Sequence, residues 1–250
     1  MPNARILVTV LGIALAAVSA AGLVAQSGAG SPEWETLAQA PLPEGVEPIL
    51  SINSLTLPAE PTPRITQSHT HSGPVVAYIL TGEIENQIEP DPPAIHKPGG
   101  YFVEPPMHVH RMLRNLSTTE PATLIISQVG RTRVPESLLK PLQEEAAKLL
   151  QSQHQWQVPF RTTVNQELRV FRLTLPAGGR AESRAHTGSG LVYVLEGTIR
   201  TSAASVPVQT HGAGDLFLDP SYRAGLAFRN TSGSEPAKLL LYQISEKAAQ

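Results

Sequence analysis

The sequence predicts an all-β protein that consists of two small barrels joined by a short helical connector. The first observation is a repeat, because residues 68–129 resemble residues 183–244 with a constant offset of 115, which takes Tyr78 to Tyr193. The second is that 23 prolines and 19 glycines separate short apolar runs, a composition that favours turn-rich β-structure over helices. An offset held over about 60 residues indicates that both copies share one fold.

The predicted strands support the same division. Residues 49–57 alternate between apolar and polar side chains, and residues 168–175 repeat this pattern with an offset of 118. Each copy has room for a barrel of roughly 100 residues with a modest core. We assign residues 1–25 to a signal peptide, 26–47 to a flexible spacer, 48–132 to the N-terminal barrel, 133–160 to the helical connector and 161–250 to the C-terminal barrel.

The N-terminal residues have the pattern of a secretory signal. A short basic region, Met1–Arg5, precedes an apolar run over 6–25 that ends in small residues, with a cleavage site after Ala20 or Ala25. We therefore expect a periplasmic or secreted protein. The alternative is an uncleaved membrane anchor, since about 20 apolar residues can span a bilayer.

The connector contains the one helix that the sequence predicts, over residues 141–151. Its apolar residues fall on one face, and Pro141 stands at its first position, where a missing N–H costs nothing. This amphipathic helix, together with exposed edge strands, makes a homodimer reasonable. By contrast, residues 26–47 are rich in small residues and proline, which is typical of a mobile spacer.

Three histidines of the first copy form a candidate metal site. His69 and His71 are two residues apart, and on a strand such positions point to the same face. His110 follows an aromatic strand over 101–104 and can bring a third imidazole from a neighbouring strand. Because the chain has no cysteine, any metal must be held by nitrogen and oxygen ligands.

These motifs resemble those of the cupin superfamily. The first cupin motif is His-x-His, then usually a Glu and then a Gly, and the second ends in a His followed by an Asn. The matching residues are His69, His71 and Gly82 in the first motif, and Pro105, His110 and Asn115 in the second. In its duplicated form the chain is similar to a bicupin, which implies two double-stranded β-helix (jelly-roll) barrels over about 48–244.

The sequence departs from the cupin pattern at the Glu, which would fall at Val75 or Val76. The resemblance then implies a three-histidine site, as in some non-haem iron dioxygenases of this superfamily. Glu104 is interpreted as an orienting or acid/base residue beside the metal, with a ligand role as the alternative. His108 competes with His110 for the third position, and the motif spacing favours His110.

The second copy lacks most of these residues and serves as an internal control. Its counterparts of His69 and His110 are Arg184 and Gly225, and only His186 remains. Residues shared by both copies are assigned to the fold; they include His96 with His211 and Arg114 with Arg229. Function is therefore expected in the first copy.

We expect a metal-binding bicupin, a dioxygenase-type oxidoreductase that acts on a small organic substrate, with a loose resemblance to quercetinase-like enzymes. The cofactor is one divalent transition metal, with Fe(II) favoured over Mn, Ni, Zn or Cu. The alternative is a non-catalytic binding protein with a structural or ligand-holding metal, and a third hypothesis is an envelope-associated structural protein. The net charge of −2 and the lack of a basic stripe argue against nucleic acid.

Overall fold

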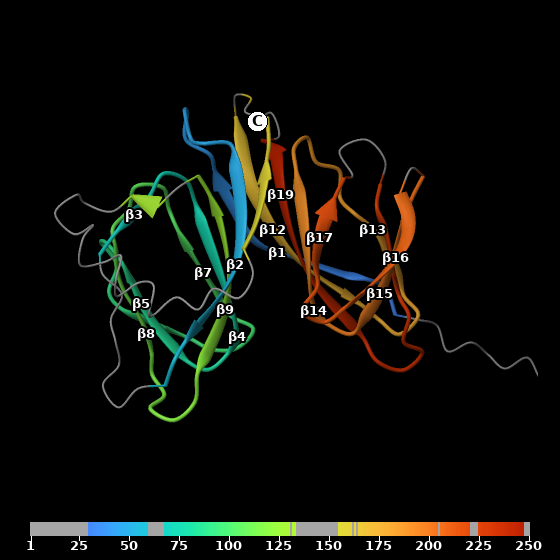
Figure 1. Ribbon diagram of the computed structural model, residues 1–250, viewed down its shortest axis with the longest axis horizontal. Helices are drawn as coiled ribbons and strands as arrows, with labels where there is room; N and C mark the ends of the chain where they lie inside the picture. Colours follow the sequence, from blue (N-terminus) through green and yellow to red (C-terminus); the bar gives the residue numbers. More distant parts are fainter. Residues whose placement is uncertain are drawn as a thin grey trace, which may run out of the picture.

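The computed structural model describes residues 30–59, 68–130, 132–133, 155–161, 163, 165–204, 206–220 and 225–247. These residues form 19 β-strands and no helix (Figure 1). Every strand pair among them is antiparallel. The described chain is therefore an all-β protein whose strands are held together by long-range pairing.

The strands form five sheets, three of which make up the N-terminal half. The order is β11-β2-β9-β4-β7 in the largest sheet, β6-β5-β8 in the second and β10-β3 in the smallest. These strands are β2 (Ile49–Leu57), β3 (Thr70–His71), β4 (Val75–Thr81), β5 (Ile84–Ile88), β6 (Ala94–His96), β7 (Tyr101–Glu104), β8 (His110–Asn115), β9 (Ala122–Val129), β10 (Thr132–Arg133) and β11 (Gln155–Pro159).

Two sheets make up the C-terminal half, in the orders β1-β12-β19-β14-β17 and β13-β18-β15-β16. Their strands are β1 (Glu33–Pro41), β12 (Gln166–Leu175), β13 (Arg180–Glu182), β14 (Gly190–Glu196), β15 (Thr198–Ala203), β16 (Val206–Gly212), β17 (Leu216–Asp219), β18 (Ala227–Asn230) and β19 (Ala237–Glu246). The two halves lie side by side in Figure 1.

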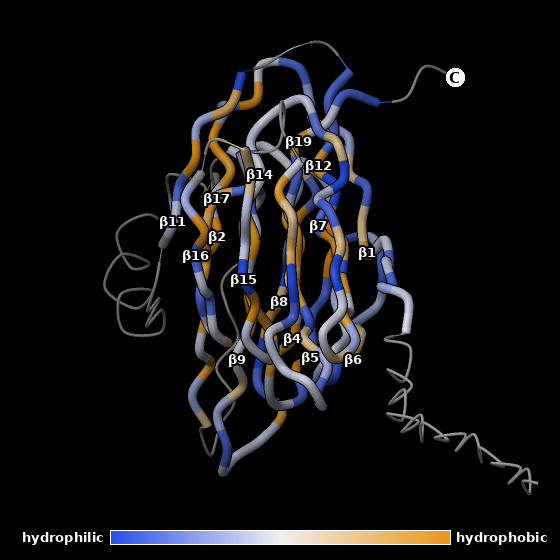
Figure 2. Tube along the Cα trace, turned by 90° about the vertical axis from the view of Figure 1, so that its right-hand side faces the viewer, coloured by the Kyte–Doolittle hydropathy of each residue, from blue (hydrophilic) through white to orange (hydrophobic). Residues whose placement is uncertain are grey.

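Alternation along each strand determines which residues face the core. On β2, Leu50 and Ile52 point to a cluster between the two halves, whereas Leu55 and Leu57 point into the N-terminal half. This period of two follows from the pleat of a β-strand. Figure 2 shows the result as apolar segments along the inner strands and hydrophilic segments at the turns and edges.

One hydrophobic cluster spans both halves. It joins Leu50 and Tyr78 of the N-terminal sheets to Leu168 and Tyr242 of the C-terminal sheets, and all four are buried. Each half also has an inner cluster of its own. The burial of apolar surface between the halves thus fixes them against each other.

The two halves also exchange strands. β1 lies at the N-terminal end of the described chain but pairs with β12 of the C-terminal half, while β11 pairs with β2 of the N-terminal half. In Figure 1 the blue β1 runs beside the orange strands and the yellow β11 beside the blue β2. Each half is therefore completed by a strand from the other side of the sequence.

The prediction of two barrels joined by a helical connector is wrong for this fold. The described residues are all β and contain no helix, and the exchanged strands and shared core make the two halves one continuous structure. The helix predicted over 141–151 lies outside the described residues, as does the signal peptide over 1–25. Among the residues that the structure describes, no helix has the length and apolar character needed to cross a membrane.

The spacer predicted over 26–47 also needs correction. Its residues 33–41 form β1, in which Leu37, Ala38 and Ala40 are buried. Composition indicated a mobile segment because short, small residues dominate it, but those same side chains fit a closely packed edge strand. The bulge between Thr36 and Ala38 adjusts its register against β12.

Candidate metal centre

Three segments of the N-terminal half meet at one point. His69 and His110 are paired in the backbone, because His69 N donates to His110 O over 3.1 Å and His110 N donates to His69 O over 2.9 Å. Met107 N donates to His71 O over 2.9 Å and so ties the loop before β8 to β3. Backbone pairing therefore brings together the two histidine motifs, which are distant in the sequence.

The side chains of His69, His71, Glu104 and His110 form a compact cluster. One potential ligand atom from each lies within 4.8 Å of the others. The ring centroid of His69 is 4.8 Å from that of His71 and 5.0 Å from that of His110. His71, Glu104 and His110 are buried, and His69 is partly exposed. His69 thus marks the side from which solvent reaches the cluster.

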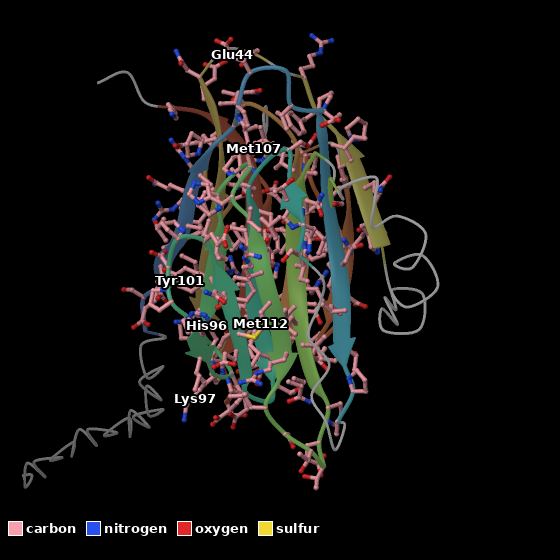
Figure 3. The ribbon with its side chains drawn as sticks, turned by 90° about the vertical axis from the view of Figure 1, so that its left-hand side faces the viewer. Glu44, His96, Lys97, Tyr101, Met107 and Met112 are labelled. Carbon is pink, nitrogen blue, oxygen red and sulfur yellow. The ribbon has the colours of Figure 1, made fainter. Side chains whose placement is uncertain are left out.

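The cluster lies toward one end of the N-terminal half. Figure 3 shows Met107 toward the end at which Glu44 stands, whereas His96 and Met112 lie nearer the opposite end. Met107 is exposed and has a positive φ of 64°. Because its amide is bonded to His71, the cluster belongs to the Met107 end.

Glu104 supplies the carboxylate that the first motif lacks. Val75 on β4 is the direct cross-strand partner of Glu104 on β7. Paired residues point to the same face of a sheet and have Cβ atoms about 5 Å apart. The carboxylate therefore enters the cluster from the neighbouring strand instead of from β4.

The distances within the cluster fit a shared ion. Glu104 Oε2 lies 3.0 Å from His71 Nε2 and 3.3 Å from His110 Nδ1. Two ligand atoms about 2.1 Å from one ion and at right angles to each other lie about 3.0 Å apart. Glu104 Oε2 and His110 Nδ1 are both buried and have no partner of hydrogen-bond geometry, although the close contact with His71 favours the ionised form of Glu104. An ion held between these atoms would satisfy both.

The orientation of His110 is set by a backbone carbonyl. His110 Nε2 lies 2.9 Å from Met112 O, and a carbonyl can only accept a hydrogen bond, so Nε2 carries the hydrogen. In the neutral ring Nδ1 then presents its lone pair to the cluster. Such outer hydrogen bonds are the usual means of orienting a metal-ligating histidine.

The protonation of the cluster also suits a cation. Burial lowers the pKa of His110 below its ordinary value of 6.5, and the charge of Glu104 only partly opposes this. Burial acts to raise the pKa of Glu104, but the contact with His71 and the neighbouring histidine charges bring it below its ordinary value of 4.5. At neutral pH His110 is therefore a neutral imidazole and Glu104 an ionised carboxylate.

The other histidines of the N-terminal half lie outside the cluster. His108 Nδ1 lies 3.0 Å from Glu89 O on the exposed side of the strand, so His110 and not His108 completes the cluster. His96 Nε2 is bonded to Asn86 Oδ1 at 2.8 Å, and its ring packs 5.1 Å from that of Phe102. These contacts agree with the structural role predicted for His96.

Three arginines near the repeat motifs, Arg111, Arg114 and Arg229, have partners outside the histidine cluster. Arg114 Nε donates to Glu85 Oε2 over 2.6 Å, and Arg111 forms a salt bridge with Glu89 on the exposed surface. In the C-terminal half Arg229 pairs with Arg180 and Arg200 across neighbouring strands. The described structure therefore places none of the three in the histidine cluster.

The C-terminal half contains a related buried pair that the sequence argument did not identify. His186 Nε2 lies 3.4 Å from Asp219 Oδ2, and both side chains are fully buried. Asp219 also accepts hydrogen bonds from Ser183 Oγ and Gln243 Nε2. Like Glu104, Asp219 stands before a proline, and this shared pattern was the available signal. Since Arg184 is exposed, the described residues at this place offer two potential ligands, His186 and Asp219.

No family model and no curated protein matches the sequence. The fold does match solved structures. Oxalate decarboxylase from Bacillus subtilis, described with Mn(II) centres, aligns with a TM-score of 0.53 and 15% identity over 89% of this chain and 79% of its own. Salicylate 1,2-dioxygenase from Pseudaminobacter salicylatoxidans aligns with a TM-score of 0.53 and 14% identity over 82% of this chain and 75% of its own.

The chain therefore has the β-barrel fold of the cupin proteins, as its motifs predicted. One alignment runs across most of the chain, in agreement with a continuous all-β structure and not with two units joined by a helix. Within this fold the three histidines and Glu104 define a candidate metal site. At these identities the likeness establishes the fold alone.

Proposed function

We propose that this protein binds one divalent transition metal through His69, His71, His110 and Glu104 and uses it to oxidise a small organic molecule. The observation that carries the proposal is the position of Glu104 Oε2, 3.0 Å from His71 Nε2, buried and without a hydrogen-bond partner. A buried carboxylate beside three imidazoles is costly unless a cation compensates it. This extends the role of Glu104 from an orienting residue to a ligand.

The donor set favours a metal of intermediate softness. Three imidazole nitrogens and one carboxylate oxygen suit Fe(II), Mn, Co, Ni, Zn or Cu, and the ion bound also depends on supply. We propose Fe(II), with Mn next, because a six-coordinate ion would keep two positions free beside four protein ligands. The bound ion would supply Lewis acidity and redox chemistry to those two positions.

The chain itself would position the reactants and exclude water. Phe102, with its ring 6.3 Å from that of His110, and the apolar inner cluster form the floor of the site. Glu104 is ionised at neutral pH and can accept a proton from a substrate hydroxyl through a carboxylate oxygen. Because His69 is partly exposed, one side is open for entry. We therefore favour a dioxygenase-type reaction on a hydroxylated compound.

The same geometry also favours a second function. Four protein ligands can close a tetrahedral zinc shell, as structural zinc sites do. In that case the protein is a non-catalytic binding protein. The difference lies in whether exchangeable water remains on the ion, because a closed shell leaves no position for substrate.

Metal content and water exchange test these proposals together. Purified protein should contain about one transition metal per chain, and a His69→Ala/His110→Ala variant should contain none. Loaded with Mn(II), the wild type should enhance water-proton relaxation, and an oxygen electrode should record uptake with one or more phenols. Lack of metal would overturn the site, and bound metal without water exchange or oxygen uptake would favour the binding protein.

We further propose that the protein is secreted or periplasmic, based on the basic and apolar pattern over 1–25. N-terminal sequencing of the protein recovered from its native cell should begin after Ala20 or Ala25. Recovery with Met1 in a membrane fraction would instead indicate an anchor.

A further inference from the structure

We propose that Asn53 recognises the substrate. The group that the substrate presents to Asn53 is an uncharged hydroxyl or carbonyl, and not a carboxylate that would add to the charge of Glu104. The inference rests on the proposed metal function and concerns the wall of the same site. It follows from the register of four strands, from a comparison of the two halves and from the charges of the inner face.

The metal cluster lies on the first of two rows of inner residues. Ser51 on β2, Gln128 on β9, Val75 on β4 and Glu104 on β7 are successive cross-strand neighbours. Because paired residues share a face, all four point to the same side of the sheet as Glu104. These four residues, the first row, therefore form the barrel wall at the level of the metal.

Asn53 belongs to the second row. It pairs with Ile126, which pairs with Ala77, which pairs with Phe102. Ala77 and Phe102 belong to the inner cluster of the N-terminal half, and Ile126 packs against it, so Asn53 faces the same interior. Asn53 is displaced from the first row by two residues, about 6.6 Å along the strand, and β2 lies three strand spacings of about 4.8 Å from β7 across the sheet. A ligand that contacts both the metal and Asn53 must therefore reach across the barrel interior.

The amide of Asn53 is free in the described structure. Its side chain makes no hydrogen bond there, although Ser51 and Gln128 of the first row donate to backbone carbonyls. Asn53 is only partly buried, despite its inward position on a paired strand. A partly hydrated amide on an inner wall is ready to exchange water for a ligand oxygen.

The corresponding row of the C-terminal half has only apolar side chains. Phe171, Leu241, Val192 and Phe217 form its second row through the corresponding pairings. Phe171 stands where Asn53 stands, and Val192 where Ala77 stands. Trp34 packs against Phe171 at 6.0 Å, and Arg184 covers both rings at 4.9 and 4.8 Å. Large apolar side chains thus fill this layer in the half that lacks the histidine cluster.

The inner face also limits the charge of the substrate. The described side chains of both inner rows include no lysine or arginine, and Arg111 and Arg114 are held by Glu89 and Glu85. A second carboxylate would add negative charge near Glu104 with no described cation to pair it. A buried charge without a partner is strongly disfavoured, whereas a hydroxyl or carbonyl needs only the amide.

A matched ligand pair tests the inference without relying on turnover. Co(II)-loaded protein can be titrated with 4-hydroxybenzamide and with 4-hydroxybenzoate, in which the hydroxyl can face the metal and the group at the opposite end of the ring differs in charge. The visible Co(II) spectrum reports each dissociation constant. We expect wild type to bind 4-hydroxybenzamide more tightly, and Asn53→Leu to weaken 4-hydroxybenzamide by roughly tenfold, which corresponds to about 1.4 kcal/mol.

The controls distinguish loss of the Asn53 contact from a change in packing and from loss of the metal. Asn53→Ser removes the amide with less change in packing and should also weaken 4-hydroxybenzamide, while Ser54→Ala lies on the opposite face of β2 and should not. Both Asn53 variants should retain Co(II). Retained Co(II) with unchanged 4-hydroxybenzamide binding would overturn the role of Asn53, and tighter binding of 4-hydroxybenzoate by wild type would overturn the substrate class. A wild type that binds no Co(II) would instead refute the metal site.

Discussion

Val75 and Glu104 face each other across β4 and β7, and the carboxylate of Glu104 reaches the histidines from the strand next to the one on which the motif would place it. The carboxylate is thus present in the cluster but comes from β7 and not from β4. This relationship can be tested by moving the group to β4.

Exchange of these two residues should transfer the ligand. Glu104→Val should lower metal affinity at least tenfold, because an ionised ligand is lost from a buried site. In the Val75→Glu/Glu104→Val protein the carboxylate starts about 5 Å away on the same face, and part of the affinity should return. Competition with a chromogenic chelator measures both. An exchange variant that folds but binds no better than Glu104→Val would contradict the pairing argument.

His71 and His186 should respond differently to the same substitution. His71→Ala removes a ligand and should reduce bound metal by tenfold or more, whereas His186→Ala affects a pair with only Asp219 as a further candidate ligand. Both histidines are buried, so the two variants carry similar packing losses. Metal analysis of the two proteins makes the comparison. Loss of metal in His186→Ala would indicate that the metal site lies in the C-terminal half.

The metal-free protein should lose stability as pH falls below about 6.5. His110 has a lowered pKa in the folded state, so between its folded and unfolded values the unfolded chain binds a proton that the folded chain does not. His96 and His211 act in the same direction, and Glu104 contributes only below its ordinary value of 4.5. Urea unfolding at pH 7 and pH 5.5 should show the loss, and it should be smaller in His110→Gln.

Metal retention should follow the same direction, because protons compete with the metal for His110. Because the pKa of His110 in the folded protein lies below 6.5, affinity should be nearly constant down to pH 6.5 and decline only at lower pH. The slope is measured by equilibrium dialysis, and a His110→Gln protein that still showed the full decline would assign it to another histidine.

Asn115 should be important for stability and not for the metal. Its buried amide donates to Glu120 O over 2.8 Å and accepts from Ser117 N over 3.0 Å, and Asn230 makes the same bonds to Glu235 O and Ser232 N. Alanine at either position would leave buried groups unpaired, at a cost of about 2 kcal/mol. Thermal unfolding should show similar losses for both variants, with metal content unchanged; a selective loss of metal in Asn115→Ala would contradict this.

The motifs predicted the cupin fold and the three histidines because each depends on short-range spacing. His69 and His71 are neighbours on one side of the chain, and His110 lies in the second motif at the expected separation. Glu104 was identified as close to the site, but its place among the ligands depends on the register between β4 and β7, which spacing alone cannot determine.

The arrangement of the two halves could not be predicted in the same way. The pairing of β1 with β12 and of β11 with β2 depends on which edge is open in the folded molecule, a property of distant strands. Local composition carries little of that information, because strand preference reflects packing context more than the residues themselves. Asn53 was missed for the same reason, since only the cross-strand rows show which way it faces.

The exchanged strands also affect how this protein behaves in a crowded solution. β1 covers an edge of β12 and β11 covers an edge of β2, so a half released on its own would expose a row of unpaired amides and carbonyls. Such edges recruit strands from other molecules and start aggregation. β12 and β2 are therefore inner strands only while the chain is intact, and β1 and β11 are then the outer strands of their sheets.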